Sequence, residues 1–293
     1  MNINHFENEP IAPSDLQNQP VEKSCLYVVA TPIGNLNDLS PRAFHVLRNA
    51  DIIAAEDTRV SRTLINLTKS KAECYSNHKF NEKQSVNLFI NALQSGKSVA
   101  LVSDAGTPGV SDPGFILVEA AHNSGLKVIA IPGPSSVISA CSVSGIDCSK
   151  FIFIGFMPKK QNEIHTAILS HLDLKCPIIF FDTSNRIQDT IKDLSTILSP
   201  DSMFCLCKEI SKKFENILRG NIPTILEKLQ TSNIKGEWTC ILFNASLKEN
   251  KQTDNQISLE EVSNYFSINR SKAAKILSII TEKKRNEIYK DFK

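Results

Sequence analysis

The chain has 293 residues, of which 41% are hydrophobic and 22% are charged, a composition typical of globular proteins. This length exceeds what one hydrophobic core usually organises, so it predicts two domains with extensions. The formal net charge is only +2, which excludes a whole-molecule field that favours nucleic acid, and any basic surface must be local. No apolar stretch is long enough to cross a bilayer, and the start, MNINHFENEPIAPSDLQNQP, does not resemble a signal peptide. We therefore expect a soluble, cytoplasmic protein.

Eight cysteines are scattered along the chain, without a C-x-x-C pair and without a histidine at metal-ligand spacing. This pattern argues against a zinc site and against a disulfide framework. Most of the cysteines lie in apolar runs, where reduced thiols act as small core residues. We expect no metal and assign the cysteines no function.

The predicted elements of the first half begin after a polar segment, residues 1–23, which contains three prolines and predicts a disordered tail. CLYVVATP then reads as a buried strand. In SPRAFHVLRNA, Ser40 is placed to cap a helix and Pro41 to occupy its first position. Further strands are expected at DIIAAED, SVALVSD and KVIAIP, and helices at TLINL and VNLFINAL. This alternation predicts a parallel sheet with helices packed on it.

A second set of elements starts at FIFIGF and continues through PIIFFD, IQDTIKDLSTIL, MFCLCKEI and WTCILFN. The Gly-, Ser- and Pro-rich stretch between Ile131 and Phe151 is the expected joint, dividing one α/β domain, 24–146, from another, 147–247. The polar segment KENKQTDNQ predicts a linker over 248–256. Residues 257–293 have short helical periods and predict a small basic unit of helix-turn-helix type.

Three unusual turns follow strands of the first predicted sheet: TPIGNLND, DAGTPGVSDPG and PGPSS. A single glycine-rich turn is commonly just a tight connection. In open α/β sheets, however, ligands bind beyond the carboxyl ends of the strands. Three such turns at one sheet edge therefore predict a ligand site.

The composition of these turns indicates the kind of ligand. Neither G-x-x-x-x-G-K-[ST] nor G-x-G-x-x-G is present, so phosphate-binding and dinucleotide-binding loops are not indicated. Asp104 instead ends a strand, and Gly106 and Thr107 follow it, so the turn offers a carboxylate and exposed carbonyl groups. Such a lining suits a ligand with a cationic end, and a sulfonium is one.

Several blocks of the sequence resemble the tetrapyrrole-methylase superfamily, and specifically its branch that methylates ribosomal RNA. These blocks are LYVVATPIGNLNDLSPRA, ADIIAAEDTRVSRTLI, VALVSDAGTPGVSDPG and IPGPSS, followed by FIFIGFMPKK, FFDTSNRIQDTIKDL, KEISKKFENILRGNI and KGEW. Their order and spacing match over roughly residues 25–245. The combination of TPIGN, AEDTR and SDAGTPGVSDPG is highly specific. The last 35 residues resemble a helical domain found at the C-terminus of many members.

The resemblance implies a two-domain fold of the class III methyltransferases, with S-adenosylmethionine in the cleft between the domains and usually a homodimer. It also implies an activity, 2′-O-methylation of a cytidine ribose in the decoding region of 16S ribosomal RNA within the small ribosomal subunit. Carried over position by position, it predicts the following cofactor contacts: Thr31, Pro32, Gly34, Asp104, Ala105, Gly106, Val110, Ser135, Ser136, Phe181 and Gly236.

A ribose hydroxyl must lose its proton during such a transfer, which invites a general base. Glu56, Asp57 and Arg59 directly follow a strand end, where a structural ion pair is the competing interpretation. His78 is expected in a loop beside the cleft, although a loop histidine is commonly just solvated. We predict Asp57 or His78 for proton handling and Arg59 for orienting the substrate.

Predicted RNA contacts lie in the second domain and at the C-terminus. From Arg270 onward the chain has eight basic residues against three acidic ones, which favours phosphate contact in an RNA-modifying protein but also fits a solvated helix face. The predicted RNA-binding residues are Lys208, Glu209, Lys235, Arg270, Lys272, Lys283, Lys284 and Arg285.

Two other functions remain open from the sequence. One is methylation of a corrin or porphyrin precursor with the same cofactor, for which the basic C-terminal segment has no use. The other is a non-catalytic RNA-binding assembly factor that has kept an unused pocket.

Overall fold

The computed structural model describes residues 20–248, 263 and 269–280 of the chain. Its contacts divide the chain into two compact units, residues 1–247 and 248–293. The division falls at the residue where the sequence predicts the linker to begin.

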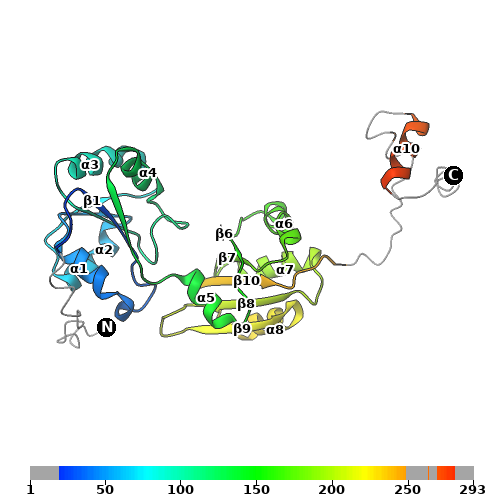
Figure 1. Ribbon diagram of the computed structural model, residues 1–293. Helices are drawn as coiled ribbons and strands as arrows, with labels where there is room; N and C mark the ends of the chain where they lie inside the picture. The colour runs from blue at the N-terminus through cyan, green and yellow to red at the C-terminus, as the bar shows by residue number, and fades with distance from the viewer. Residues whose placement is uncertain (1–19, 249–262, 264–268, 281–293) are drawn as a thin grey trace. The chain divides into compact units, whose positions relative to one another are not determined.

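The first half of the larger unit contains a five-stranded sheet in which every pair of neighbouring strands is parallel (Figure 1). The order is β3-β2-β4-β1-β5. The strands are β1 (Cys25–Val29), β2 (Ile52–Ala55), β3 (Glu73–Ser76), β4 (Val99–Val102) and β5 (Lys127–Ile131). The predicted parallel sheet is confirmed, and β3 is an additional strand at its edge.

Helices cover both faces of this sheet (Figure 1). They are α1 (Pro41–Asn49) and α2 (Thr58–Thr68) on one face, and α3 (Glu82–Gln94) and α4 (Phe115–Asn123) on the other. Alternate strand residues supply the two cores: Tyr27 packs with the first pair of helices and Leu26 with the second, because successive side chains of a strand point to opposite faces. Ser40 Oγ accepts the Ala43 N–H at 3.1 Å, so the predicted start of α1 is confirmed.

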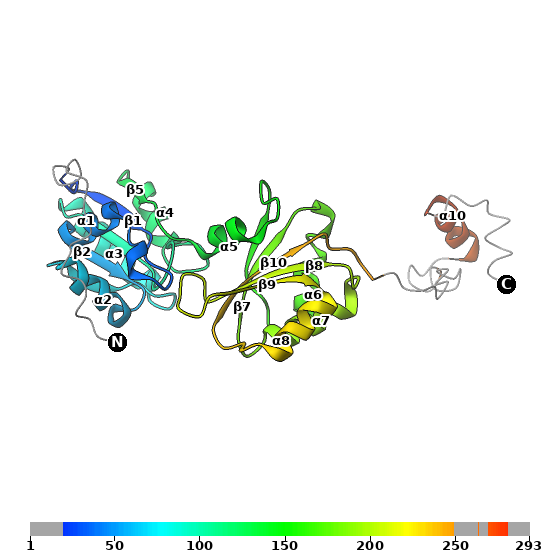
Figure 2. The ribbon, with the colours of Figure 1, turned by 90° about the horizontal axis from the view of Figure 1, so that it is seen from below.

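The second half contains a five-stranded sheet of order β6-β7-β10-β8-β9. Only β6 and β7 pair in parallel, and the other pairs are antiparallel. The strands are β6 (Ile152–Phe156), β7 (Ile178–Thr183), β8 (Met203–Lys208), β9 (Asn216–Asn221) and β10 (Glu237–Phe243). Three helices lie on one side, as Figure 2 shows: α6 (Gln161–Leu169), α7 (Ile187–Ile197) and α8 (Ile222–Thr231).

The stretch expected to join the domains contains a helix, α5 (Ser136–Ser144), which packs on the other face of the second sheet (Figure 2). Val137 and Ala140 of α5 contact the sheet core at Ile179 and Ile241. The sequence placed the domain division after residue 146. Because α5 packs with the second sheet, we place the division before Ser136.

The predicted disordered tail, residues 1–23, includes residues that the structure holds by ion pairs. Lys23 Nζ lies 2.7 Å from an Asp51 carboxylate oxygen, and Lys127 Nζ lies 2.6 Å from Glu22. These two ion pairs tie the segment before β1 to the first sheet. Residues 1–19 lie outside the described residues.

The smaller unit is described over one helix, α10 (Arg270–Ile280). Ala273, Ala274 and Leu277 form its buried side. Most of the predicted linker and of the predicted helical unit lies outside the described residues. Among the helices of the described ranges, none combines the length and apolar composition needed to cross a membrane.

Candidate active site

Three loops meet at the carboxyl edge of the first sheet because β4, β1 and β5 are neighbours there. The Thr31 N–H donates to the Gly106 carbonyl at 2.8 Å, and the Gly106 N–H donates to the Thr31 carbonyl at 3.1 Å. Thr107 Oγ1 donates to the Pro134 carbonyl at 3.3 Å. The loops after β1, β4 and β5 are thus hydrogen-bonded to one another at the sheet edge where the sequence places the three turns.

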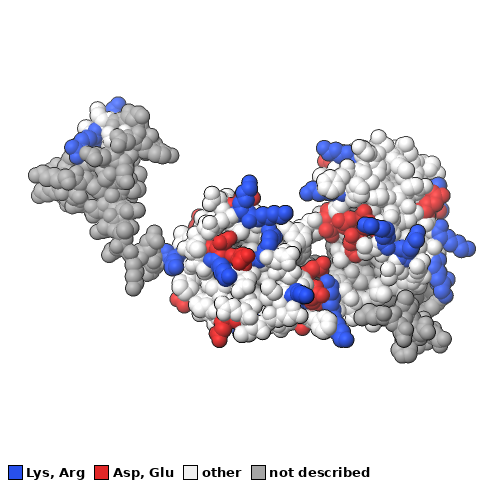
Figure 3. All heavy atoms as spheres, turned by 180° about the vertical axis from the view of Figure 1, so that it is seen from behind, with Lys and Arg blue, Asp and Glu red and all other residues white. Residues whose placement is uncertain are grey.

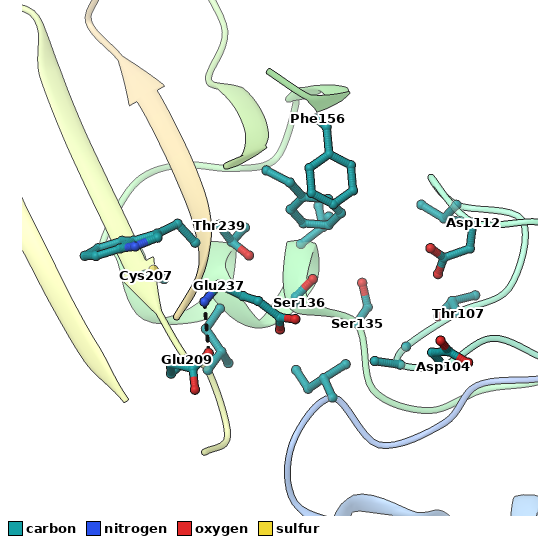
Figure 4. Close-up of a pocket in the computed structure, with 18 of the residues that line it drawn as sticks. Asp104, Thr107, Asp112, Ser135, Ser136, Phe156, Cys207, Glu209, Glu237 and Thr239 are labelled. Carbon is teal, nitrogen blue, oxygen red and sulfur yellow. Dashed lines mark hydrogen bonds between the residues drawn. The ribbon is translucent and has the colours of Figure 1, made fainter. Parts of the chain in front are cut away.

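A cavity of about 410 Å³ opens beside these loops, and both halves of the larger unit line it (Figure 4). The first half contributes Ile33, Glu56 and the loop after β4, and the start of α5, which packs on the second sheet, also lines the cavity. The second half contributes Phe156, Phe181, Glu209 and Glu237, among others. The volume lies within the range of small-molecule sites.

Most of the predicted cofactor residues lie in or against this cavity. Those that line it are Asp104, Ala105, Gly106, Val110, Ser135, Ser136 and Phe181, together with Glu209 of the predicted RNA set. Thr31 is fully buried behind the lining. Pro32 and Gly34 adjoin Ile33, and Gly236 adjoins Glu237; both neighbours line the cavity.

Two of the predicted glycines occupy positions where a side chain would not fit. A Cβ atom on Gly34 would clash with the aliphatic part of the Lys212 side chain, and one on Gly236 would clash with Glu209. Gly34 comes from the first half and Lys212 from the second. The absence of a side chain at Gly34 therefore leaves room for Lys212 of the second half.

The loop between β8 and β9 links the two halves, and sequence reasoning did not identify its role. Ser211 Oγ donates to Asp38 Oδ2 of the first half. Lys212 Nζ lies between Glu209 Oε1, at 2.9 Å, and Glu237 Oε2, at 2.8 Å. Lys212 and Glu237 line the cavity. They are far apart in the sequence, and the pairing of strands in the second sheet brings them together there.

Three carboxylates form one wall of the cavity: Glu56, Asp104 and Asp112. Glu56 Oε2 accepts the Asp104 N–H at 3.2 Å, and Asp104 Oδ1 accepts the Asp57 N–H at 3.0 Å. Burial raises the pKa of Glu56 and of Asp104. Burial, with the nearby Glu56 charge, raises the pKa of Asp112 to about 6. Figure 3 shows acidic side chains gathered on the first half beside its border with the second.

Asp57 and Arg59, both predicted as catalytic residues, form the capped start of α2. Asp57 caps α2, since its Oδ1 accepts the Arg59 N–H at 2.8 Å. The Arg59 side chain is 89% exposed, and its guanidinium also pairs with Asp57 Oδ2 at 2.6 Å. Hydrogen bonds from Arg59 lower the pKa of Asp57 to about 2, which makes this carboxylate a weak base. Neither residue is among those lining the cavity.

His78, the other predicted base, stabilises its own loop. Its Nδ1 accepts the N–H groups of Phe80 and Asn81 at 3.2 and 3.1 Å. The imidazole does not line the cavity. The loop position was predicted from the sequence, but these backbone contacts were not.

The predicted RNA contacts have different environments. Lys208 is only 5% exposed, and its Nζ donates to the Asn233 carbonyl at 2.7 Å, so we withdraw it as a phosphate contact. Lys235 is exposed, as are Arg270 and Lys272 at the start of α10. Lys283, Lys284 and Arg285 lie outside the described residues. Among the residues that the structure describes, no three His, Cys, Asp or Glu side chains are grouped to hold a metal ion.

Sequence comparison identifies both a family and individual relatives. The profile of the family described as Tetrapyrrole (Corrin/Porphyrin) Methylases matches residues 25–226. A Xylella fastidiosa protein named Ribosomal RNA small subunit methyltransferase I is 41% identical over 223 residues, which are 75% of this chain and 82% of the relative. A Pasteurella multocida protein of the same name is 36% identical over 268 residues, 90% of this chain and 95% of the relative.

Solved structures share the fold. A cobalt precorrin-4 methyltransferase of cobalamin biosynthesis matches with a TM-score of 0.54 at 18% identity, covering 75% of this chain and 95% of its own. A uroporphyrin-III C-methyltransferase from Thermus thermophilus, complexed with S-adenosylhomocysteine, matches with a TM-score of 0.51 at 16% identity, covering 75% and 97%. At these identities the likeness concerns the fold alone.

Proposed function

Because the chain belongs to the family of tetrapyrrole (corrin/porphyrin) methylases, we propose that it is an S-adenosylmethionine-dependent methyltransferase of small-subunit ribosomal RNA. The substrate class follows the names of the relatives, which extend over most of the chain. We propose the ribose 2′ oxygen of a cytidine in the decoding region of 16S ribosomal RNA as the acceptor. The protein would act in the cytoplasm, as a homodimer.

The observation that carries this proposal is the acid-walled cavity at the edge of the first sheet. Glu56, Asp104 and Asp112 give the wall a negative potential that suits a sulfonium. Gly106, with φ of +83°, keeps the loop after β4 close to the β1 loop and free of a side chain. The residues present therefore fit the cofactor.

We assign contacts with the cofactor as follows. S-adenosylmethionine, when bound, supplies a methyl group on a positively charged sulfur. Asp104 and the backbone of its loop would face the charged end, Ser135 and Ser136 would donate from the start of α5, and Phe181 would close the cavity from the second sheet. Thr31, Pro32, Gly34, Ala105, Gly106, Val110 and Gly236 would shape the cavity.

The RNA would approach from the exposed side of the loops around this cavity. Phe80, in the loop between β3 and α3, is 90% exposed and follows the exposed Lys79. An exposed aromatic ring next to a cation suits stacking on an unpaired base. Lys235 and the basic C-terminal unit would add phosphate contacts.

The proposal is tested with small ribosomal subunits that lack this methylation. The purified protein is incubated with these particles and a labelled methyl donor, and the ribosomal RNA is then hydrolysed in alkali. We expect label in an alkali-resistant dinucleotide, because a methylated 2′ oxygen cannot attack the adjacent phosphate. Label in a mononucleotide would indicate base methylation and contradict the 2′-O proposal.

Two further results would overturn the function itself. Transfer to a corrin or porphyrin precursor, with none to the particles, would move the substrate to the tetrapyrrole class. Absence of S-adenosylmethionine binding in calorimetry at millimolar ligand would leave only a non-catalytic RNA-binding role.

A further inference from the structure

The proposed reaction needs a group that accepts the proton of the ribose hydroxyl, and this inference rests on that proposed function. Asp57 is engaged by Arg59, and the His78 ring nitrogen accepts two backbone N–H groups. Neither side chain lines the cavity. The carboxylates that do line the cavity, Glu56, Asp104 and Asp112 among them, are in a position to accept this proton.

Asp112 has the position that such an acceptor requires. It belongs to the loop between β4 and α4, and its side chain faces the cavity from the side opposite Glu237 and Glu209 (Figure 4). Phe156 and Ser135 line the same cavity. A methyl acceptor that entered the cavity between the two halves would pass this carboxylate.

The backbone around Asp112 is held firmly. The Gly109 N–H donates to the Pro113 carbonyl at 3.1 Å, which closes the loop on both sides of Asp112. The Gly114 N–H donates to Glu82 Oε1 at 2.7 Å, and the Ile116 N–H donates to the same oxygen at 3.3 Å. Glu82 is 3% exposed, so the anchor itself is fixed. Pre-organisation of this kind is expected of a group that must meet a reacting atom.

Asp112 differs from the other two carboxylates of the wall, Glu56 and Asp104, in its hydrogen bonds and in the effect of its surroundings on its pKa. Glu56 and Asp104 each accept a backbone N–H. Burial raises the pKa of Asp112 most, the charges of Glu56 and Asp104 raise it further, and a hydrogen bond from Ser103 lowers it. The resulting pKa, about 6, lies close to neutral pH. From the second half, Glu237 and Lys212 face the same cavity and pair with each other.

We infer that Asp112 is the catalytic residue that accepts the proton of the ribose 2′ hydroxyl. As its carboxylate oxygen bonds to the proton, the hydroxyl O–H bond breaks and the oxygen forms its new bond to the methyl carbon. The carbon–sulfur bond breaks, and its electron pair stays on sulfur. The protonated Asp112 carboxyl then releases its proton to water. Glu82 is a positioning residue in this scheme, because it acts through the loop that contains Asp112.

The first test is the pH dependence of methylation by the full chain. For the wild type, kcat/KM is expected to rise with pH and level off above a midpoint near 6, because only the ionised carboxylate accepts a proton. Asp112→Asn should lower kcat by about 10²- to 10⁴-fold and remove this rise. Asp201→Asn, on an exposed turn outside the cavity, serves as the matched control and should keep both rate and profile.

A second measurement does not depend on turnover. The folded pKa of Asp112 is raised, so the folded protein binds more protons than the unfolded chain between about pH 4 and 6, and ionisation of Asp112 costs stability above that range. Asp112→Asn should therefore unfold at a higher temperature than the wild type at pH 7.5 and lose this advantage near pH 4. It should also bind S-adenosylhomocysteine within about threefold of the wild type in calorimetry.

The outcomes separate this inference from the proposed function. If Asp112→Asn methylates the particles at the wild-type rate with the same pH profile, Asp112 is not the acceptor and the function stands. If Asp112→Asn is less stable than the wild type at pH 7.5, and slow only because it no longer binds the cofactor, Asp112 has a structural role instead. A wild-type protein that transfers no methyl group to the particles overturns the function and, with it, this inference.

Discussion

At the scale of single residues, Gly106 has a left-handed backbone conformation and also lines the proposed cofactor cavity. Its φ of +83° is a conformation that costs a β-branched residue roughly 1–3 kcal/mol. A Cβ there would lie 3.4 Å from Ile33, which lines the cavity. We expect Gly106→Val to abolish S-adenosylmethionine binding, measured by calorimetry, because the branched side chain displaces the loop, while circular dichroism shows a folded protein.

Gly96 provides the control for this prediction. Its φ is +89°, and an added Cβ would meet nothing within 4 Å. It lies in the turn before β4, at the opposite end of that strand from Gly106. Gly96→Val should lose comparable stability and bind the cofactor normally. Normal binding by Gly106→Val, or equal loss in both variants, would show that the site is misplaced.

The residues of the site that were predictable from the sequence are those on the loops of the first sheet. Asp104 and Gly106 directly follow a strand, and parallel topology places all such positions at one edge. Lys212 and Glu237 were not predictable in this way, because they reach the cavity through antiparallel pairing in the other half. The pairing of Asp57 with Arg59, given as an alternative to catalysis, is the arrangement that the structure has.

At the scale of elements, Glu82 joins α3 to the start of α4. Its buried carboxylate accepts two N–H groups at the N-terminus of α4, where the helix dipole also favours a negative charge. Glu82→Gln should lower the free energy of unfolding by about 1.5–3 kcal/mol, the range for hydrogen bonds to charged groups. Because the Asp112 loop loses its anchor, kcat should fall as well. Urea unfolding and steady-state kinetics measure the two effects.

Glu119→Gln, on the exposed side of α4, is the matched control and should change stability by less than about 0.5 kcal/mol. If Glu82→Gln loses stability but keeps the wild-type kcat, Glu82 supports the fold without positioning the loop.

Three of the elements that the sequence did not predict, β3, β9 and α5, lack a strong local signal. β3 and β9 are edge strands with largely exposed side chains, so they lack the continuous apolar run that identified β1 and β4. The α5 segment is rich in serine, which favours turns and caps. Ser135 does cap α5, by accepting the Ile138 N–H at 3.5 Å, and packing on the second sheet stabilises the helix. Tertiary contacts outweigh local preference at these places.

At the scale of the whole molecule, the cavity and the basic C-terminal segment belong to different units. Every residue that lines the cavity lies between Ile33 and Thr239, within the unit of residues 1–247. The sequence predicted this separation from the polar linker. Cofactor binding and RNA binding should therefore be separable by truncation.

Deletion of residues 256–293 removes all eight basic residues of the C-terminal segment. The truncated protein should bind S-adenosylmethionine with an unchanged Kd, because its cavity is intact. Its KM for small ribosomal subunits at about 0.15 M salt should rise at least roughly tenfold, since contacts with phosphate dominate the affinity of such interfaces. For binding to small ribosomal subunits, the slope of log Kd against log salt concentration should become shallower, because fewer phosphate contacts remain.

Arg270→Ala combined with Lys272→Ala is the milder version of this experiment and keeps the segment in place. It should weaken binding in the same direction by a smaller factor and reduce the salt slope by about two, because each of the two removed cations would neutralise one phosphate. Filter binding over a salt series measures both quantities.

A truncated protein that keeps the wild-type KM and salt slope would assign the RNA contacts to the larger unit, where the exposed Lys79, Phe80 and Lys235 remain.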